Sequence, residues 1–95
     1  MENPGIYIAT SQALPERSFI FSATDGVEVW GIHYDVAMKG KHQVKRIQEH
    51  FKQNPSDIFD VKLLFKCGKN EFVHYTNHFI ERMKPYFNQK SKAKK

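Results

Sequence analysis

The hydrophobic pattern of this chain changes period part-way along the sequence, and this change constrains the fold more than any other feature. In the first third, the β-prone residues gather in three short runs, which are Ile6–Thr10, Phe19–Thr24 and Val27–Gly31. From His42 onwards, apolar residues recur mainly at helical spacing. A 95-residue chain has room for one core, so we expect helices that pack against a single sheet.

The dipeptide Asp25-Gly26 lies between the second and the third β-prone run. Asp-Gly is a favoured sequence for a two-residue type I′ turn, because both residues tolerate positive φ at low cost. We therefore predict a β-hairpin that joins Phe19–Thr24 to Val27–Gly31.

Helical spacing in the rest of the chain predicts two helices with one strand between them. The first helix is expected at residues 42–53 and ends before Pro55, because proline disfavours helical geometry in the residue before it. A strand is expected at residues 58–65, and a second helix at residues 71–84 ends before Pro85. The predicted order is β-(β-β)-α-β-α. This is an α+β fold in which two helices cover one face of a small antiparallel sheet of three or slightly more strands.

The net charge of +5 makes nucleic acid a plausible partner. Four lysines lie in residues 90–95, which we interpret as a flexible basic tail on a single domain formed by residues 1–89. This tail fits a solvated, frayed end as well as a phosphate-binding arm. The lone cysteine, Cys67, favours a reducing compartment and hence an intracellular location, cytoplasmic or nuclear. No apolar run is long enough for a membrane span.

Five short segments are spread over nearly the whole chain, and in chain order they are Gly5–Tyr7, Asp25–Gly31, Lys45–Phe51, Phe59–Phe65 and His78–Asn88. Together they resemble the GIY-YIG nuclease family. The last segment is the most persuasive, because Ile80, Pro85 and Asn88 keep the family's residue types and spacing. The resemblance implies a nuclease-like β-β-α-β-α core.

Two positions that are functional in that family carry other residues in this chain. Val29 stands where the family has the tyrosine of Tyr-Ile-Gly, and Thr76 stands where it has its metal-binding glutamate. The spacer from Tyr7 to Val29 is also longer than the family's. A second register, in which Phe19–Phe21 takes the place of the Gly-Ile-Tyr strand, therefore stays open.

In the family, a divalent metal held by the glutamate activates phosphodiester hydrolysis, a tyrosine helps to activate water and an arginine stabilises the phosphate. The resemblance therefore implies catalytic roles for Tyr7, Arg46 and His50, and phosphate contacts for Arg46, Lys45 and Lys41. Tyr34 is a second candidate for the phenol. The residues alone favour another interpretation: a solvated arginine, a buried hydrogen-bonded histidine and packed tyrosines.

Other polar residues offer weaker candidates for chemistry. Glu71 and Glu49 are spare carboxylates, but both fit solvated helix positions. His74 and His78 have the i, i+4 spacing of a zinc-binding pair without the glutamate of the zincin signature. Cys67 has no neighbouring base. We therefore expect no cofactor, because Thr76 occupies the metal-ligand position, and Mg²⁺ only if the nuclease chemistry is retained.

The leading hypothesis is a degenerate GIY-YIG-like endonuclease domain that binds nucleic acid, DNA rather than RNA, and has lost efficient cleavage. One alternative is an active metal-dependent DNA endonuclease of that family. Another is a small protein-binding or inhibitor module on the same scaffold, because a fold does not fix a function. A carboxylate within metal reach of Arg46 would favour the active enzyme.

Overall fold

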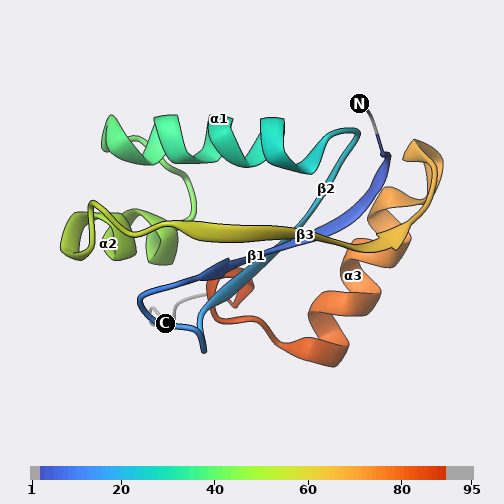
Figure 1. Cartoon of the computed structure of the whole chain (residues 1–95). Helices are drawn as coiled ribbons and strands as arrows, with labels where there is room; N and C mark the ends of the chain where they lie inside the picture. Colours follow the sequence, from blue (N-terminus) through green and yellow to red (C-terminus); the bar gives the residue numbers. More distant parts are fainter. Residues whose placement is uncertain (1–2, 90–95) are drawn as a thin grey trace.

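Three strands form one antiparallel sheet in the order β2-β1-β3 (Figure 1). The structure is a computed structural model and describes residues 3–89. The strands are β1 (Gly5–Ser11), β2 (Ser18–Ala23) and β3 (Phe59–Lys66). In the central strand, Tyr7 lies opposite Phe21 of β2 and Leu63 of β3. The expected α+β class with a three-stranded antiparallel sheet is confirmed.

Helices lie on both faces of this sheet (Figure 1). They are α1 (Gly26–Met38), α2 (Lys45–Gln53) and α3 (Phe72–Met83), with short 3-10 helices η1 (Lys69–Glu71) and η2 (Tyr86–Asn88). α1 and α2 pack on one side of the sheet, whereas α3 packs on the other, so the prediction that helices cover only one face was wrong. Among residues 3–89, no helix has the length and apolar character of a membrane span.

Aromatic side chains fill the core between the sheet and the α1–α2 layer. The Trp30 ring of α1 lies 4.7 Å from the Phe59 ring and 6.2 Å from that of Phe51, measured between centroids. η2 adds Phe87, whose ring lies 5.8 Å from Phe59. Aromatic rings bury large apolar areas, so this layer supplies much of the hydrophobic stabilisation of the fold.

The predicted Asp25-Gly26 hairpin was wrong, because Val27–Gly31 lies within α1. Asp25 is the N-cap of this helix, and its Oδ1 accepts a hydrogen bond of 3.1 Å from the Glu28 N–H. Burial of Trp30 and Ala37 on the sheet-facing side outweighs the β-propensity of the valines. The hairpin in the structure joins β1 to β2 through residues 12–17, and the order is β-β-α-α-β-α.

The other expected elements differ from the structure only at their ends. The first expected helix begins at Lys45 instead of residue 42, and the later strand and helix are each within one residue of the prediction. α3 ends at Lys84, which adopts left-handed geometry with φ of 48° directly before Pro85. Such geometry is a common way to end a helix.

The side chain of Asn88 attaches the C-terminal segment to the outer edge of β2. Its Oδ1 accepts the Ile20 N–H at 2.6 Å, and its Nδ2 donates to the Ile20 carbonyl at 2.8 Å. One amide group therefore satisfies both backbone groups of a residue in an edge strand. This fixes the position of η2 beside the sheet.

Candidate functional site

The start of α2 is basic and lacks a side-chain cap. Val44 is the N-cap residue and provides no side-chain hydrogen bond to the first turn, which begins with Lys45 and Arg46. Lys41 and Lys45 are exposed, and Arg46 is half-buried. Free N–H groups at a helix N-terminus attract anions, and the two cations in this turn add to that attraction.

Arg46 is held by contacts with Tyr86 of η2. Its Nη1 donates to the Tyr86 carbonyl at 2.9 Å, and its guanidinium carbon lies 4.5 Å from the centre of the Tyr86 ring. The guanidinium carbon of Arg17 lies at the same distance from this ring. Because a guanidinium has five N–H donors, a fixed Arg46 keeps donors for a second partner.

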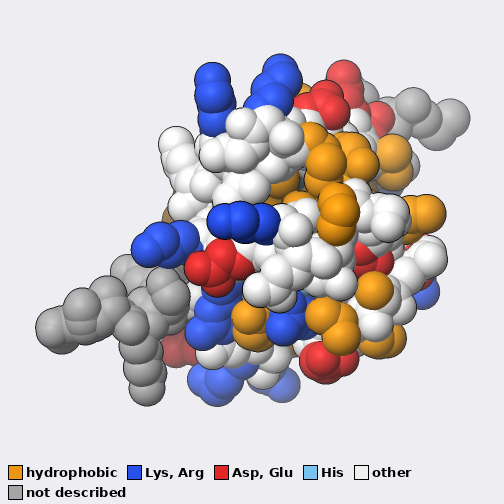
Figure 2. Space-filling model, turned by 90° about the vertical axis from the view of Figure 1, so that its left-hand side faces the viewer, with side chains coloured by type: hydrophobic (Ala, Val, Ile, Leu, Met, Phe, Trp, Pro, Cys, Tyr) orange, Lys and Arg blue, Asp and Glu red, His pale blue; other side chains and the backbone are white. Residues whose placement is uncertain are grey.

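A cavity of about 380 Å³ opens beside this first turn. Its lining combines residues from the start of α2, from η2 and from β2, which are Phe19, Gln43, Val44, Lys45, Arg46, Phe87, Asn88 and Gln89. Lys and Arg side chains are visible around this end of the molecule, with Asp and Glu side chains between them (Figure 2). The structure thus brings the predicted phosphate contacts Lys45 and Arg46 together at one concave surface.

His50 belongs to a buried polar network that also contains Arg17, Asp57 and Ser11. Its Nε2 lies 2.7 Å from Asp57 Oδ2, and its Nδ1 lies 3.2 Å from Arg17 Nη1. Arginine can only donate, so Nδ1 accepts and Nε2 carries the proton that it donates to Asp57. The side chain of His50 has no exposed surface, and both ring nitrogens have protein partners. This arrangement leaves no atom of the ring for a phosphate.

Asp57 is the centre of this network. Its Oδ2 also accepts the Ser11 hydroxyl at 2.5 Å, and its Oδ1 accepts the Ala13 N–H at 3.0 Å. Burial opposes ionisation, but the hydrogen bonds outweigh it and lower the pKa of Asp57. The carboxylate stands between serine and histidine, whereas a nucleophilic triad needs histidine in the middle. The network therefore stabilises the fold and has no arrangement for catalysis.

Tyr7 lies away from Arg46, near the N-terminal end of the chain. Its hydroxyl donates to the Asn3 carbonyl at 2.5 Å, and its ring stacks on Phe21 with 5.9 Å between centroids. The ring lies so close to Gly26 that a Cβ there would approach it to 2.1 Å. The start of β1 and α2 lie at opposite ends of the sheet (Figure 1). The structure therefore does not bring Tyr7 and Arg46 into one site.

The second candidate phenol, Tyr34, lies on α1 with its ring edge-on to Phe51. The sequence analysis did not predict a further polar pair, which joins α1 to the connector that follows it. His33 Nδ1 lies 2.9 Å from Nε2 of His42, in the connector between α1 and α2. Burial lowers the pKa of His33, and burial with the charge of His33 lowers that of His42. The pair forms through the turn of the chain after α1, which no local sequence pattern indicates.

The helix that directly follows the first hairpin is α1, so α1 and not α2 corresponds in order to the family's arginine-bearing helix. α1 carries neither arginine nor lysine, and β2, the second strand, carries no tyrosine. Val29 packs against the core from α1, so it is not part of a Tyr-Ile-Gly strand. The pair Arg46 and His50 therefore lies on α2, the second helix of the chain, and not on the helix that follows the hairpin. Their catalytic role stays a prediction.

Thr76 of α3 stands where the resemblance places the metal-binding glutamate. Its hydroxyl is buried and has no hydrogen-bond partner within the part of the chain that the structure describes. Over residues 3–89, no three His, Cys, Asp or Glu side chains gather into a group that could hold a metal ion. A lone hydroxyl is a poor ligand for a hard cation, so these residues do not fit a Mg²⁺ site.

The weaker candidates are accounted for by local structure. Glu71 Oε1 accepts the Gly68 N–H at 3.2 Å, and Glu49 is exposed. His74 and His78 are exposed on α3. Burial, with a smaller effect of Glu71, raises the pKa of the Cys67 thiol, which disfavours the thiolate.

Two solved structures share this fold. The catalytic domain of the homing endonuclease I-TevI matches with a TM-score of 0.75 and 22% identity, over 96% of this chain and 99% of that chain. A point mutant of the same domain matches with a TM-score of 0.79 and 22% identity, over 96% and 94% of the two chains. No family model and no curated protein matches the sequence. I-TevI is a GIY-YIG nuclease, so the expected GIY-YIG-like fold is confirmed.

Proposed function

We propose that this chain is a nucleic-acid-binding domain that uses the GIY-YIG nuclease fold and has lost metal-dependent cleavage. The observation that carries this proposal is Thr76, a buried hydroxyl without a partner among residues 3–89, at the position of the expected metal-binding acid. Loss of the main metal ligand removes both water activation and stabilisation of the leaving oxygen, so the loss of cleavage is near complete.

The binding surface is the first turn of α2 with the adjoining cavity. Lys41, which is exposed in the connector before this turn, adds a further positive charge. Lysine and arginine at an uncapped helix N-terminus favour the phosphate backbone, which is common to all sequences. We propose DNA as the polymer, by analogy with the DNA nuclease fold. Binding is electrostatic and weakly sequence-specific, because the proposed contacts are to phosphates, which carry no sequence information.

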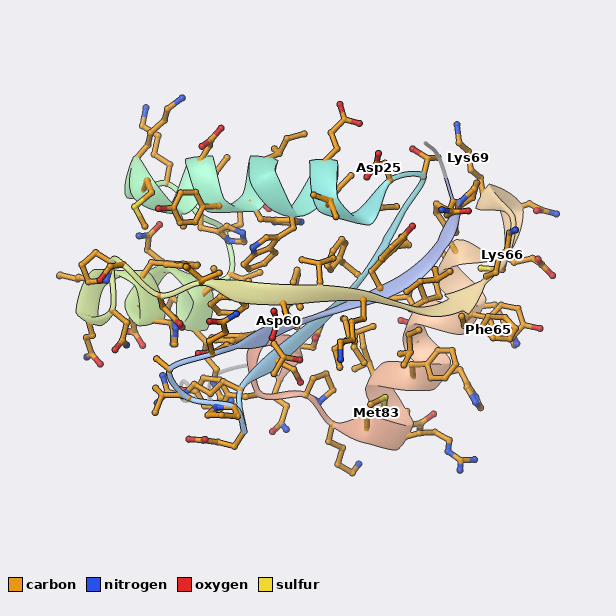
Figure 3. All side chains as sticks on the ribbon, in the orientation of Figure 1. Asp25, Asp60, Phe65, Lys66, Lys69 and Met83 are labelled. Atoms are coloured by element: carbon orange, nitrogen blue, oxygen red, sulfur yellow. The ribbon has the colours of Figure 1, made fainter. Side chains whose placement is uncertain are left out.

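Fluorescence anisotropy with labelled duplex and single-stranded DNA, measured over a series of salt concentrations, tests the binding. Wild-type affinity should fall steeply with salt, and Lys45→Ala should lower the slope of log affinity against log salt by about one. Lys69→Ala is the matched control, because Lys69 is exposed and lies at the end of the sheet away from α2 (Figure 3). Its slope should equal that of the wild type.

No binding at low salt, or equal effects of the Lys45 and Lys69 substitutions, would contradict this surface. The first result would favour the alternative of a protein-binding module. Incubation of labelled DNA with the protein and Mg²⁺ or Mn²⁺ tests the loss of cleavage. We expect no nicking by the wild type, and Thr76→Glu alone should restore little, because β2 also lacks the tyrosine. Metal-dependent nicking that disappears in Arg46→Ala would support the active endonuclease instead.

A further inference from the structure

We infer that the outer edge of β3 is an interface through which two copies of this chain pair as antiparallel strands about Val61. β3 is at the edge of the sheet, and its only strand partner among residues 3–89 is β1. An edge strand presents unpaired N–H and C=O groups that can bind another strand. Two exposed apolar side chains lie at this strand: Ile58 is 64% exposed and Leu63 is 43% exposed.

The first part of β3 keeps regular strand geometry. Its pairing with β1 shifts between Ile6 and Tyr7, so that Leu64 has no partner in β1. Such a bulge bends a strand and interrupts further pairing beyond it. Regular pairing with another strand is therefore available to Phe59–Leu63 and not to the end of β3.

This segment is complementary to itself. In antiparallel pairing about Val61, Asp60 lies opposite Lys62 of the second copy, and Phe59 lies opposite Leu63 of the second copy. Two-fold symmetry repeats both pairs. Directly opposite residues share one face of a sheet, so the pairing places opposite charges together twice. It also places the exposed Leu63 of each copy beside Phe59 of the other, which is a core residue and 8% exposed. This charge complementarity identifies a second copy as the occupant.

The two faces of the segment suit this pairing. Asp60 lies on the side of β3 away from α1 (Figure 3). Lys62 is two residues further along the strand and therefore shares this face, and both side chains are exposed. Its Oδ1 accepts one hydrogen bond, of 3.1 Å, from the exposed Gln12 side chain. A carboxylate accepts several hydrogen bonds, so Asp60 keeps capacity for a lysine from a second copy.

The other face offers an apolar groove for Leu63 of the second copy. A cavity of about 330 Å³ lies between α1 and the start of β3, where Val27, Tyr34, Ile58 and Phe59 contribute to its lining. Gly31 is also in this lining, and a Cβ there would meet no atom within 4 Å, so the groove is open at this point. Leu63 of the second copy lies opposite Phe59 and therefore beside this groove.

Sedimentation velocity over a concentration series tests the pairing with a charge exchange. Wild-type protein should form dimers, and Asp60→Lys or Lys62→Asp should weaken dimerisation by about tenfold, because each places like charges opposite each other twice. The double variant Asp60→Lys/Lys62→Asp should recover wild-type affinity. Lys66→Asp is the matched control, because Lys66 is exposed and lies beyond the bulge. Thermal unfolding midpoints should confirm that all variants are folded.

Three results would overturn the interface. The wild type could remain monomeric over the whole concentration range, or Lys66→Asp could weaken dimerisation as much as Lys62→Asp. The third result would show that Asp60 and Lys62 have the opposite role and prevent edge-to-edge pairing. In that case the neutral variant Asp60→Asn/Lys62→Gln would associate more strongly than the wild type, whereas the proposed pairing requires it to associate more weakly.

Discussion

The buried polar groups at the two ends of this molecule differ in how their hydrogen-bonding capacity is satisfied. Near α2, the side chains of Ser11, Arg17, His50 and Asp57 bond to one another. On α3, the hydroxyl of Thr76 is buried with no partner among the described residues. The network near α2 contains the residue types usual in catalysis, and the position where chemistry was expected has only an unpaired hydroxyl.

This difference shows that residue type alone does not locate an active site. The hydrogen bonds of the network near α2 connect the end of β1, the loop at residues 12–17 and the segment before β3. Its serine, histidine and aspartate therefore stabilise the fold. A fully satisfied polar network fixes one arrangement of these elements. An unsatisfied hydroxyl costs free energy and does nothing for the fold.

Removal of His50 should produce the largest effect. His50→Ala leaves Arg17 and Asp57 without their shared partner and opens a cavity beside Phe59 and Phe87. We expect the free energy of unfolding to fall by about 3 kcal/mol in chemical denaturation. Gln12→Ala, which removes an exposed hydrogen bond, should change it by less than about 0.5 kcal/mol. If His50→Ala changed the free energy of unfolding as little as Gln12→Ala, the network would not be important for stability.

Removal of the Ser11 hydroxyl should have a moderate effect. This hydroxyl donates to Asp57 and accepts the Leu14 N–H at 2.9 Å, so Ser11→Ala removes one hydrogen bond to Asp57 and leaves the Leu14 N–H without its partner. We expect a loss of about 1–2 kcal/mol in the free energy of unfolding, from the same denaturation measurement. No loss would mean that water replaces the serine.

The matching change on α3 should have the opposite sign. Thr76→Val keeps the shape of the side chain and removes a buried hydroxyl without a partner. We expect a gain of up to about 1 kcal/mol in the free energy of unfolding. A loss similar to that of Ser11→Ala would show that the Thr76 hydroxyl has a partner in solution, and the contrast between the two ends would no longer hold.

The pH dependence of stability should give the weakest signal, because the network contains a single carboxylate. The pKa of Asp57 is lower in the folded protein than its ordinary value near 3.9. Its stabilising contribution is therefore complete above that ordinary value and is lost as the pH falls through the folded-state pKa. Denaturation midpoints of Asp57→Asn should fall less than those of the wild type below about pH 4. Parallel pH profiles would contradict the network.

Local patterns predicted the parts of this fold that short-range signals determine. Pro55 and Pro85 place the ends of two helices correctly, and the runs at Ile6 and Phe59 are strands. The error at Val27–Gly31 arose because Asp-Gly and two valines favour a hairpin. Asp25 followed by Glu28 at N-cap spacing, with Trp30 and Ala37 seven residues apart, was the available signal for a helix.

The candidate site was harder to predict, because its contacts join distant parts of the chain. Ser11 and Asp57 are 46 residues apart in sequence, so the role of His50 depends on a contact that no local pattern contains. The position of Thr76, in contrast, was inferred from spacing within one segment, in which Ile80, Pro85 and Asn88 set the register, and it stays a prediction. Sequence spacing was misleading across the connector between α1 and α2, because Arg46 and His50 lie on the second helix and not on the helix after the hairpin.

The amide of Asn88 has a consequence for the size of any assembly that this sheet can form. By occupying the backbone groups of Ile20, it obstructs β2, so only one of the two sheet edges remains available for growth. A sheet with two open edges can add copies without limit and form fibres, whereas a sheet with one open edge closes after a single two-fold contact. One asparagine side chain thus limits the pairing proposed at β3 to two copies.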